Sequence, residues 1–220
     1  MLKTLASLLQ LIYPPSCLIC STAGFKICLT CKGKWQQDIK SGTLNNFPIY
    51  FTNFYNSDCA KIVLSAKENG NLIAQELLAD SISKSLKFAI AKLNLNQEIG
   101  LVTIPSSPSS IRKRGLDHIN ILSKKVIASY ISSEIKINNL PILKISKKIQ
   151  DQSKLNKAQR LQNMSGAYQA IKPKSSTKNL IIVDDLITTG ASIQEAVRAL
   201  SEINLRPVAI ITACAVGAHL

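Results

Sequence analysis

The sequence predicts an α/β fold with a parallel sheet, preceded by a small cysteine-rich module. Short apolar segments alternate with segments of helical spacing between residues 99 and 212, which is typical of a parallel sheet that helices cover on both faces. Four of the six cysteines crowd into residues 17–31. The 220 residues are 46% hydrophobic with a mean hydropathy of +0.13, so the chain can bury a sizeable core, which argues against intrinsic disorder.

An amphipathic pattern opens the chain. Apolar side chains recur at helical spacing at Leu2, Leu5, Leu8, Leu9 and Ile12. We predict a short helix that docks on the body of the protein, in preference to a membrane anchor, because its polar face has no cluster of Lys and Arg. The pattern is not that of a secretory signal, since no small-residue cleavage site follows at a suitable distance. No apolar run is long enough to span a membrane, so we expect a cytoplasmic protein.

The cysteine segment predicts a metal site. Two C-x2-C pairs, separated by seven residues, are formed by Cys17, Cys20, Cys28 and Cys31. Each pair can place two thiolates on one ion, and two pairs complete the tetrahedral sulfur site of structural zinc. Disulfides and reduced core cysteines are the alternatives, but two pairs this close in a reducing location favour Zn²⁺. The segment holds no His or carboxylate, so the ion would stabilise a module too small for its own core.

A polar stretch after Trp35 suggests a boundary near residue 45. Residues 1–45 would form the amino-terminal helix and a zinc-ribbon-like module, and residues 46–220 the α/β domain. The elements expected in this domain are strands over residues 49–55, 99–104, 142–145, 179–183 and 207–212, with helices over residues 58–67, 72–93 and 115–130 and a last helix that carries Ile193, Ala196, Val197, Leu200 and Ile203. Residues 146–163 are polar and basic without an apolar period, which predicts a mobile loop.

Residues 180–192 carry the strongest functional signal. Their apolar strand delivers Asp184 and Asp185 to its carboxyl end, where ligands bind in open α/β sheets. The next helix opens with Thr188, Thr189, Gly190, Ala191 and Ser192, whose hydroxyls and free N–H groups can cradle a phosphate. The carboxylates would repel that anion, so they suit sugar hydroxyls or a cation. A sugar phosphate satisfies both halves, and a strand-turn-helix without a ligand is the alternative.

The same segment resembles the phosphoribosyl pyrophosphate (PRPP) motif of type I phosphoribosyltransferases. The resemblance implies the parallel-sheet, Rossmann-like fold of these enzymes, with Asp184 and Asp185 on the ribose hydroxyls and residues 188–192 on the 5′-phosphate. It also implies that the turn with Ser106 and Ser107 lies where pyrophosphate binds. A P-loop and a dinucleotide fingerprint are excluded, because neither Gly-Lys-Ser/Thr nor G-x-G-x-x-G is present.

Nearly the whole chain resembles the competence protein F (ComF, GntX-like) family. The two cysteine pairs after Pro14, an Arg-x-Arg-Gly segment and a basic segment that ends at an aromatic residue carry this resemblance. The last two are matched by Arg112, Arg114 and Gly115, and by Arg160, Asn163, Gly166, Ala167 and Tyr168. Leu116-Asp117-His118 stands where the family usually has Phe-Asn-Gln. The resemblance implies a role in DNA uptake during natural transformation, with single-stranded DNA and DNA-uptake proteins as partners.

Basic residues concentrate in the middle of the chain. The formal net charge is +14, and residues 111–178 hold 15 Lys and Arg residues against 3 Asp and Glu residues. Pyrophosphate or a nucleic-acid backbone could be contacted by Arg112, Arg114, Lys147, Lys148 and Arg160, and a solvated basic surface is the alternative. Aromatic residues make up only 5% of the chain, which weakens the case for a single-strand binder that works by base stacking.

Two functions are compatible with these residues. The first is a ComF-type protein with a pocket for PRPP or a similar sugar phosphate and a basic segment that faces single-stranded DNA. The second is an active transferase that uses PRPP with Mg²⁺, moves the phosphoribosyl group to an unidentified acceptor and releases pyrophosphate. A ligand sensor without chemistry is a third reading. Neither histidine is assigned to the site, and we expect His118 to be partly exposed on its helix.

Overall fold

The computed structural model describes residues 14–35, 38–130, 135–147, 156–173 and 179–217. The helix expected over residues 2–12 lies outside this part of the chain. None of the helices in the described part is both long enough and apolar enough to cross a membrane.

The large sheet is almost entirely parallel, which confirms the predicted α/β fold class. Its strands are β1 (Lys40–Leu44), β2 (Phe47–Phe51), β3 (Asn53–Phe54), β4 (Ile99–Thr103), β5 (Ile137–Asn139), β8 (Asn179–Ile187) and β9 (Pro207–Ala215). They follow the order β1-β2-β9-β8-β4-β5, and β3 also pairs with β9. Among the described strands of this large sheet, β1 alone runs antiparallel to its neighbour. Strand β8 lies between β4 and β9, so both of its edges are paired, and its alternating apolar residues face the two core clusters on either side of the sheet.

The hairpin of β1 and β2 is an element that the sequence analysis does not anticipate. Asn45 and Asn46 connect the strands, and both have positive φ angles, 49° and 67°. Two consecutive left-handed residues make the tight turn that matches the twist of paired strands, and Asn tolerates this conformation. The domain boundary near residue 45 stays a prediction, while β1, which precedes it, belongs to the large sheet.

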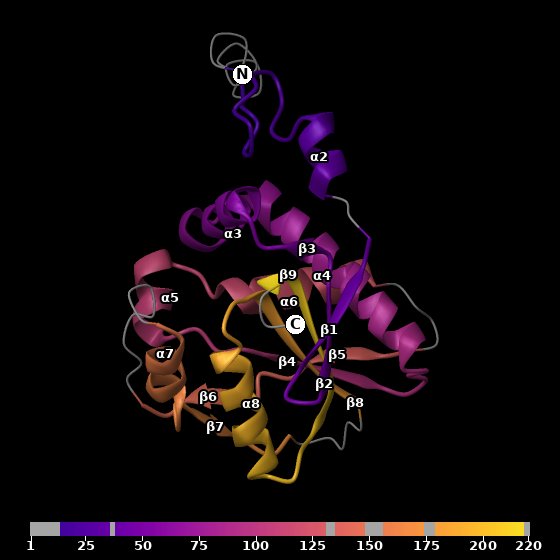
Figure 1. The fold of residues 1–220 in the computed structure, drawn as a ribbon, viewed down its shortest axis with the longest axis vertical. Helices are drawn as coiled ribbons and strands as arrows, with labels where there is room; N and C mark the ends of the chain where they lie inside the picture. The colour runs from indigo at the N-terminus through magenta and orange to yellow at the C-terminus, as the bar shows by residue number, and fades with distance from the viewer. Residues whose placement is uncertain (1–13, 36–37, 131–134, 148–155, 174–178, 218–220) are drawn as a thin grey trace, which may run out of the picture.

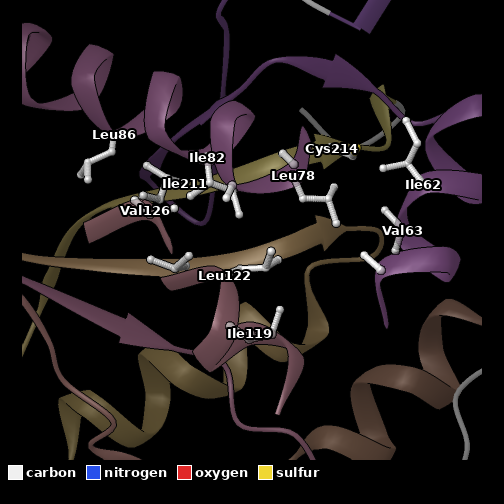
Figure 2. Packing of buried hydrophobic residues seen from close by; sticks show 14 of the residues in the cluster. Ile62, Val63, Leu78, Ile82, Leu86, Ile119, Leu122, Val126, Ile211 and Cys214 are labelled. Atoms are coloured by element: carbon white, nitrogen blue, oxygen red, sulfur yellow. The ribbon is translucent and has the colours of Figure 1, made fainter. Parts of the chain in front are cut away.

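Helices cover both faces of the sheet (Figure 1). One face packs against α3 (Ser57–Asn69), α4 (Leu72–Lys92) and α6 (His118–Ser129). The other packs against α8 (Ala191–Ser201) and a small sheet of β6 (Leu143–Ile145) and β7 (Tyr168–Ala170), beside α7 (Lys157–Met164). Figure 2 shows apolar side chains of α3, α4 and α6 pointing toward Ile211 and Cys214 of β9. Burial of these side chains is the main stabilising contribution.

Two short helices lie where the sequence analysis expects none. Helix α7 occupies part of the predicted loop 146–163, because Asn156 and Gln159 form a capping box whose side chains bond each other's backbone N–H groups. Helix α5 (Pro108–Arg114) begins where Ser107 caps the N–H of Ser110, and it ends at Gly115 with a φ of 72°. Both helices are short and polar, so periodicity alone does not reveal them.

The cysteine module, with α2 (Leu29–Trp35), lies beyond α3 and joins the core beneath it (Figure 1). The indole N–H of Trp35 donates to the carbonyl oxygen of Leu77 in α4 at 3.2 Å. The ammonium group of Lys61 in α3 donates to the carbonyl oxygen of Ile19 at 2.6 Å. The module is therefore attached to α3 and α4, two of the helices that cover one face of the sheet.

Candidate functional site

The carboxyl edge of the sheet brings two distant segments together. Strands β4 and β8 are parallel neighbours, with Thr103 opposite Val183. The loop that follows Ile104 and the acidic pair that follows Val183 therefore emerge at the same edge, where ligands bind in sheets of this kind.

A cavity of about 700 Å³ opens at this edge. Its walls come from α3, α5, α6, β6, β7, β8 and the start of α8. The lining residues are Val63, Lys67, Glu68, Ile104, Pro105, Ser106, Ser107, Ser109, Ser110, Lys113, Arg114, Ile119, Ile145, Tyr168, Asp184, Asp185, Leu186, Thr188 and Ser192. The volume lies in the range that holds a ligand the size of a nucleotide.

Asp184 and Asp185 differ in their affinity for a proton. Burial, together with the negative charge of Asp185, raises the pKa of Asp184 well above its usual value. Burial acts on Asp185 in the same direction, but a hydrogen bond with His118 and the charge of Lys67 outweigh it, so the pKa of Asp185 is lowered. Asp184 is therefore the carboxyl of the pair that binds a proton more readily.

His118 contradicts the expectation of a partly exposed residue. Its side chain is completely buried, and its Nε2 lies 3.1 Å from Oδ2 of Asp185. Asp117 accepts a hydrogen bond from the N–H of Asn120 and so caps α6, which makes His118 the first residue of that helix. The sequence contains no local signal for this contact, because its partner lies on a strand 67 residues further along the chain.

The turn between β8 and α8 places hydroxyls at the cavity wall. Thr188 and Ser192 line the cavity, whereas Thr189, Gly190 and Ala191 do not. Gly190 is the N-cap of α8 with a φ of 74°, and no side chain caps the helix there. A Cβ on Gly190 would lie 2.6 Å from a methyl group of Leu44, so both the left-handed backbone and the contact with β1 require glycine. The start of α8 thus offers backbone N–H groups beside two hydroxyls.

The segment after β4 adds serines and cations to the opposite wall. Ser106 and Ser107 line the cavity, as do Lys113 and Arg114 of α5. The guanidinium of Arg114 forms an ion pair with Glu68 of α3 at 2.8 Å. This pair joins α5 to the carboxyl end of α3 over the cavity.

The other predicted basic contacts lie outside the cavity walls. Arg112 and Lys147 are exposed, and Arg160 is partly exposed on α7; none of the three lines the cavity. Lys147 donates to the carbonyl oxygen of Ser165. Lys148 lies outside the residues that the structure describes. Among the described residues, the cations that line the cavity are Lys67, Lys113 and Arg114, of which Arg114 is a predicted site residue.

Tyr168 reaches the cavity from β7 and is held there by α8. Glu195, only 4% exposed, accepts hydrogen bonds from the backbone N–H of Tyr168 at 3.0 Å and from the guanidinium of Arg198 at 2.8 Å. Arg198 in turn donates to the carbonyl oxygen of Tyr168 at 2.7 Å. Burial raises the pKa of the Tyr168 phenol, so its hydroxyl stays protonated and can donate to a ligand.

Sequence reasoning missed the contribution of α3. Lys67 and Glu68 lie near its carboxyl end and face residues more than forty positions away in the chain. Their pattern in the sequence is that of an ordinary solvated helix end. Only the packing of α3 beside α5 brings them to the cavity.

The four cysteines form a second candidate site in the module. Their sulfur atoms all lie within 4.8 Å of one another, so they can hold a metal ion such as zinc. Burial would raise the pKa of Cys17, but hydrogen bonds from backbone N–H groups lower it to about 6. Burial and the neighbouring thiols raise the pKa of Cys31 to about 12. Four thiolates this close repel one another, and a divalent ion removes that repulsion.

Comparison with known families gives one match. The model of the phosphoribosyl transferase domain matches residues 110–219, which is half of the chain. No curated protein matches the sequence.

Proposed function

Because this chain belongs to the phosphoribosyl transferase domain family, we propose that the cavity at the carboxyl edge of its sheet binds PRPP. The observation that carries the proposal is that three kinds of group line one cavity. Thr188 and Ser192 at the uncapped start of α8 suit a 5′-phosphate. Asp184 and Asp185 suit the ribose hydroxyls. The serines and cations of the opposite wall suit the diphosphate.

The separation of charges in the cavity fits a ligand that is neutral in its middle and anionic at both ends. The acidic pair would repel a phosphate placed on it, so it selects the hydroxyl-bearing ring. Lys113 and Arg114 lie on the wall beyond it. Mg²⁺, if it accompanies the ligand, would neutralise the diphosphate at this end.

The reaction that this arrangement supports best is transfer of the phosphoribosyl group. The bond between C1 of the ribose and the diphosphate oxygen breaks, and the leaving diphosphate takes the electron pair. A nucleophilic atom of the acceptor forms the new bond to C1 and loses its proton to solvent. Positioning of the ring and stabilisation of the leaving group by Lys113 and Arg114 would supply most of the acceleration.

A second candidate function is that of a ComF-type protein that handles single-stranded DNA. It is supported by the cysteine cluster that precedes the transferase domain and by the exposed positions of Arg112 and Lys147 outside the cavity. Binding there would follow the phosphate backbone and weaken steeply with salt. The two functions are compatible, because their residues do not overlap. A structural Zn²⁺ in the cysteine module and a cytoplasmic location belong to this proposal.

Calorimetric titration of PRPP with Mg²⁺ tests the first proposal. Asp184→Asn combined with Asp185→Asn should weaken binding by about 100-fold, because two hydrogen-bonding carboxylates are lost together. Asp80→Asn is the matched control, since Asp80 is an exposed acid on α4 that pairs with Lys84. Unchanged affinity in the double variant would remove the acidic pair from the site.

Substitution of two arginines distinguishes PRPP binding in the cavity from DNA binding at the exposed basic residues. Arg114→Ala should weaken PRPP binding by about tenfold, whereas Arg112→Ala should leave it unchanged and instead weaken binding of a labelled single-stranded oligonucleotide at low salt. If neither Arg112→Ala nor added salt changed the affinity for the oligonucleotide, the second candidate function would be contradicted. Release of pyrophosphate in the presence of a panel of amines and bases reports on catalysis.

A further inference from the structure

His118 makes a contact that the proposed function leaves unexplained. Its imidazole is completely buried at the first position of α6. The ring does not line the cavity, so it would not touch the ligand directly. Its Nε2 instead meets Oδ2 of Asp185 at 3.1 Å.

The second ring nitrogen indicates how this contact works. Among the described residues, no hydrogen-bond partner reaches Nδ1 of His118. The contact with Asp185 is therefore the polar interaction through which the described part of the chain holds this buried ring. Because an ionised carboxylate can only accept hydrogen bonds, Nε2 is the donor in this contact.

Other charged and titratable groups surround the pair. They are Asp184 on β8, Lys67 and Glu68 on α3, Lys113 and Arg114 on α5, Tyr168 on β7 and Cys214 on β9. Lys67 acts on both carboxyls and lowers the pKa of each. Hydrogen bonding between the two carboxyls raises the pKa of Asp184 and lowers that of Asp185, whereas the hydrogen bond with His118 acts on Asp185 and lowers its pKa further.

We infer that His118 is a positioning residue that holds one carboxylate oxygen of Asp185 in place, so that the acidic pair meets the ribose hydroxyls in a single arrangement. The inference rests on the proposed function of the pair. His118 acts through Asp185 and from beneath the cavity floor. A neutral donor at the same place should do the same work, whereas an apolar side chain of similar size should not.

Carboxyl carbon NMR of the free protein tests the contact without any ligand. In His118→Leu the titration of Asp185 should move upward by about one pH unit or more, because its donor is lost. In His118→Gln, whose amide N–H reaches a similar point, it should stay near that of the wild type. Ser123→Ala is the matched control, since Ser123 is a buried residue of α6 that bonds Asn139 away from the cavity.

PRPP titrations across pH 5.5 to 8 supply the functional readout. His118→Leu should weaken binding by about tenfold across this range, because the carboxylate of Asp185 loses the hydrogen bond that fixes its orientation toward the ribose hydroxyls. His118→Gln should stay within about threefold of the wild type. A merely structural histidine would change the melting temperature in both variants and leave the PRPP affinity of the folded proteins unchanged.

The outcomes separate the inference from the proposed function. If the wild type does not bind PRPP, the proposed function fails, and the titration of Asp185 in the free variants alone decides the role of His118. A folded His118→Leu protein with an unshifted Asp185 overturns the inference. If His118→Leu does not fold, His118→Gln decides, because an upward shift of Asp185 despite the restored donor would contradict it.

Discussion

The cysteine module and the cavity are assembled in opposite ways. The four cysteine sulfurs lie within 4.8 Å of one another and come from 15 consecutive residues, 17–31. The cavity walls come from elements that span residues 63–192. Local spacing therefore determines the first site, whereas the second depends on how the sheet and its helices pack. Removal of the metal should therefore affect the cysteine module, whereas changes in the packing of the sheet and its helices should affect the cavity.

Loss of the metal should have the largest effect and should stay within the module. Cys17→Ser combined with Cys31→Ser removes two of four ligands, and structural zinc contributes on the order of 10 kcal/mol to small modules. We expect residues 14–35 to lose their protection in hydrogen exchange and the chain to lose its one equivalent of metal. PRPP affinity should change by less than about threefold, because no cysteine of the module lines the cavity.

Cys59→Ala is the control for the cysteine variant. Cys59 is buried in α3, outside the cluster, and its thiol donates to the carbonyl oxygen of Phe54. This protein should keep its metal. Protected amides over residues 14–35 in a metal-free chain would contradict the proposed structural role of zinc.

Breaking the link between β7 and α8 should cause the next largest loss of stability. Glu195→Ala breaks the buried bonds to Tyr168 and Arg198 and should destabilise the protein by about 3 kcal/mol. Glu202→Ala, on the same helix, removes only an exposed ion pair with Arg198 and should cost less than about 1 kcal/mol. Equal losses in thermal denaturation of the two variants would refute the distinction between buried and exposed partners.

The contribution of Glu195 should also depend on pH. Burial alone would raise the pKa of this carboxyl, but the hydrogen bonds from Arg198 and Tyr168 outweigh it, so the pKa is lowered. A lowered pKa means that the stabilisation is present above the usual Glu range and is lost as the pH falls through the lowered value. The melting temperatures of wild type and Glu195→Gln should therefore converge in acid.

Much of the fold follows from local patterns, and the rest from contacts over long distances. Strands β4, β8 and β9 are continuous apolar runs, so their burial on both faces is visible in the sequence. The hairpin is indicated by Asn45-Asn46, and α7 is indicated by the capping box at Asn156. A search for apolar periodicity overlooks both signals. No local pattern marks His118 as buried, because its burial comes from Asp185 and the packing of α6.

The candidate site divides in the same way. Asp184, Thr188 and Ser192 are recognisable because a strand, a turn and a helix follow one another directly. Lys67 is not, because α3 reaches the cavity only through tertiary packing. The sequence predicts Arg112 as a ligand contact, yet its side chain is exposed. Helix α5 has seven residues and none of them is buried, so its sequence has no apolar pattern that shows which side faces the cavity.

Gly190→Ala tests the close approach of the turn between β8 and α8 to β1. The added methyl group meets Leu44 and forces a left-handed alanine, so we expect a loss of about 2 kcal/mol. Adding Leu44→Ala should recover the steric part and leave the backbone part. A double variant that is less stable than the sum of the single losses, measured by urea denaturation, would contradict this explanation.

Asp184→Asn should have the smallest effect on stability, and it should stabilise the protein, unlike the other substitutions. The raised pKa of Asp184 means that the folded state holds its proton more tightly than the unfolded state, so stability falls as the pH rises through the interval between the two values. A neutral amide removes this loss and should stabilise the free protein by about 1 kcal/mol at neutral pH. PRPP binding should weaken in the same variant, and a less stable protein at neutral pH would contradict the assignment.

The most direct test of the central claim, that one cavity holds both ends of PRPP, compares the whole ligand with its halves. Calorimetry would measure the binding of PRPP, ribose 5-phosphate and diphosphate to the metal-loaded full chain. We predict one site per chain, with PRPP bound at least about 100-fold more tightly than either half, because both ends are seated at once. Equal affinity for PRPP and ribose 5-phosphate, or no measurable binding of PRPP, would contradict the account.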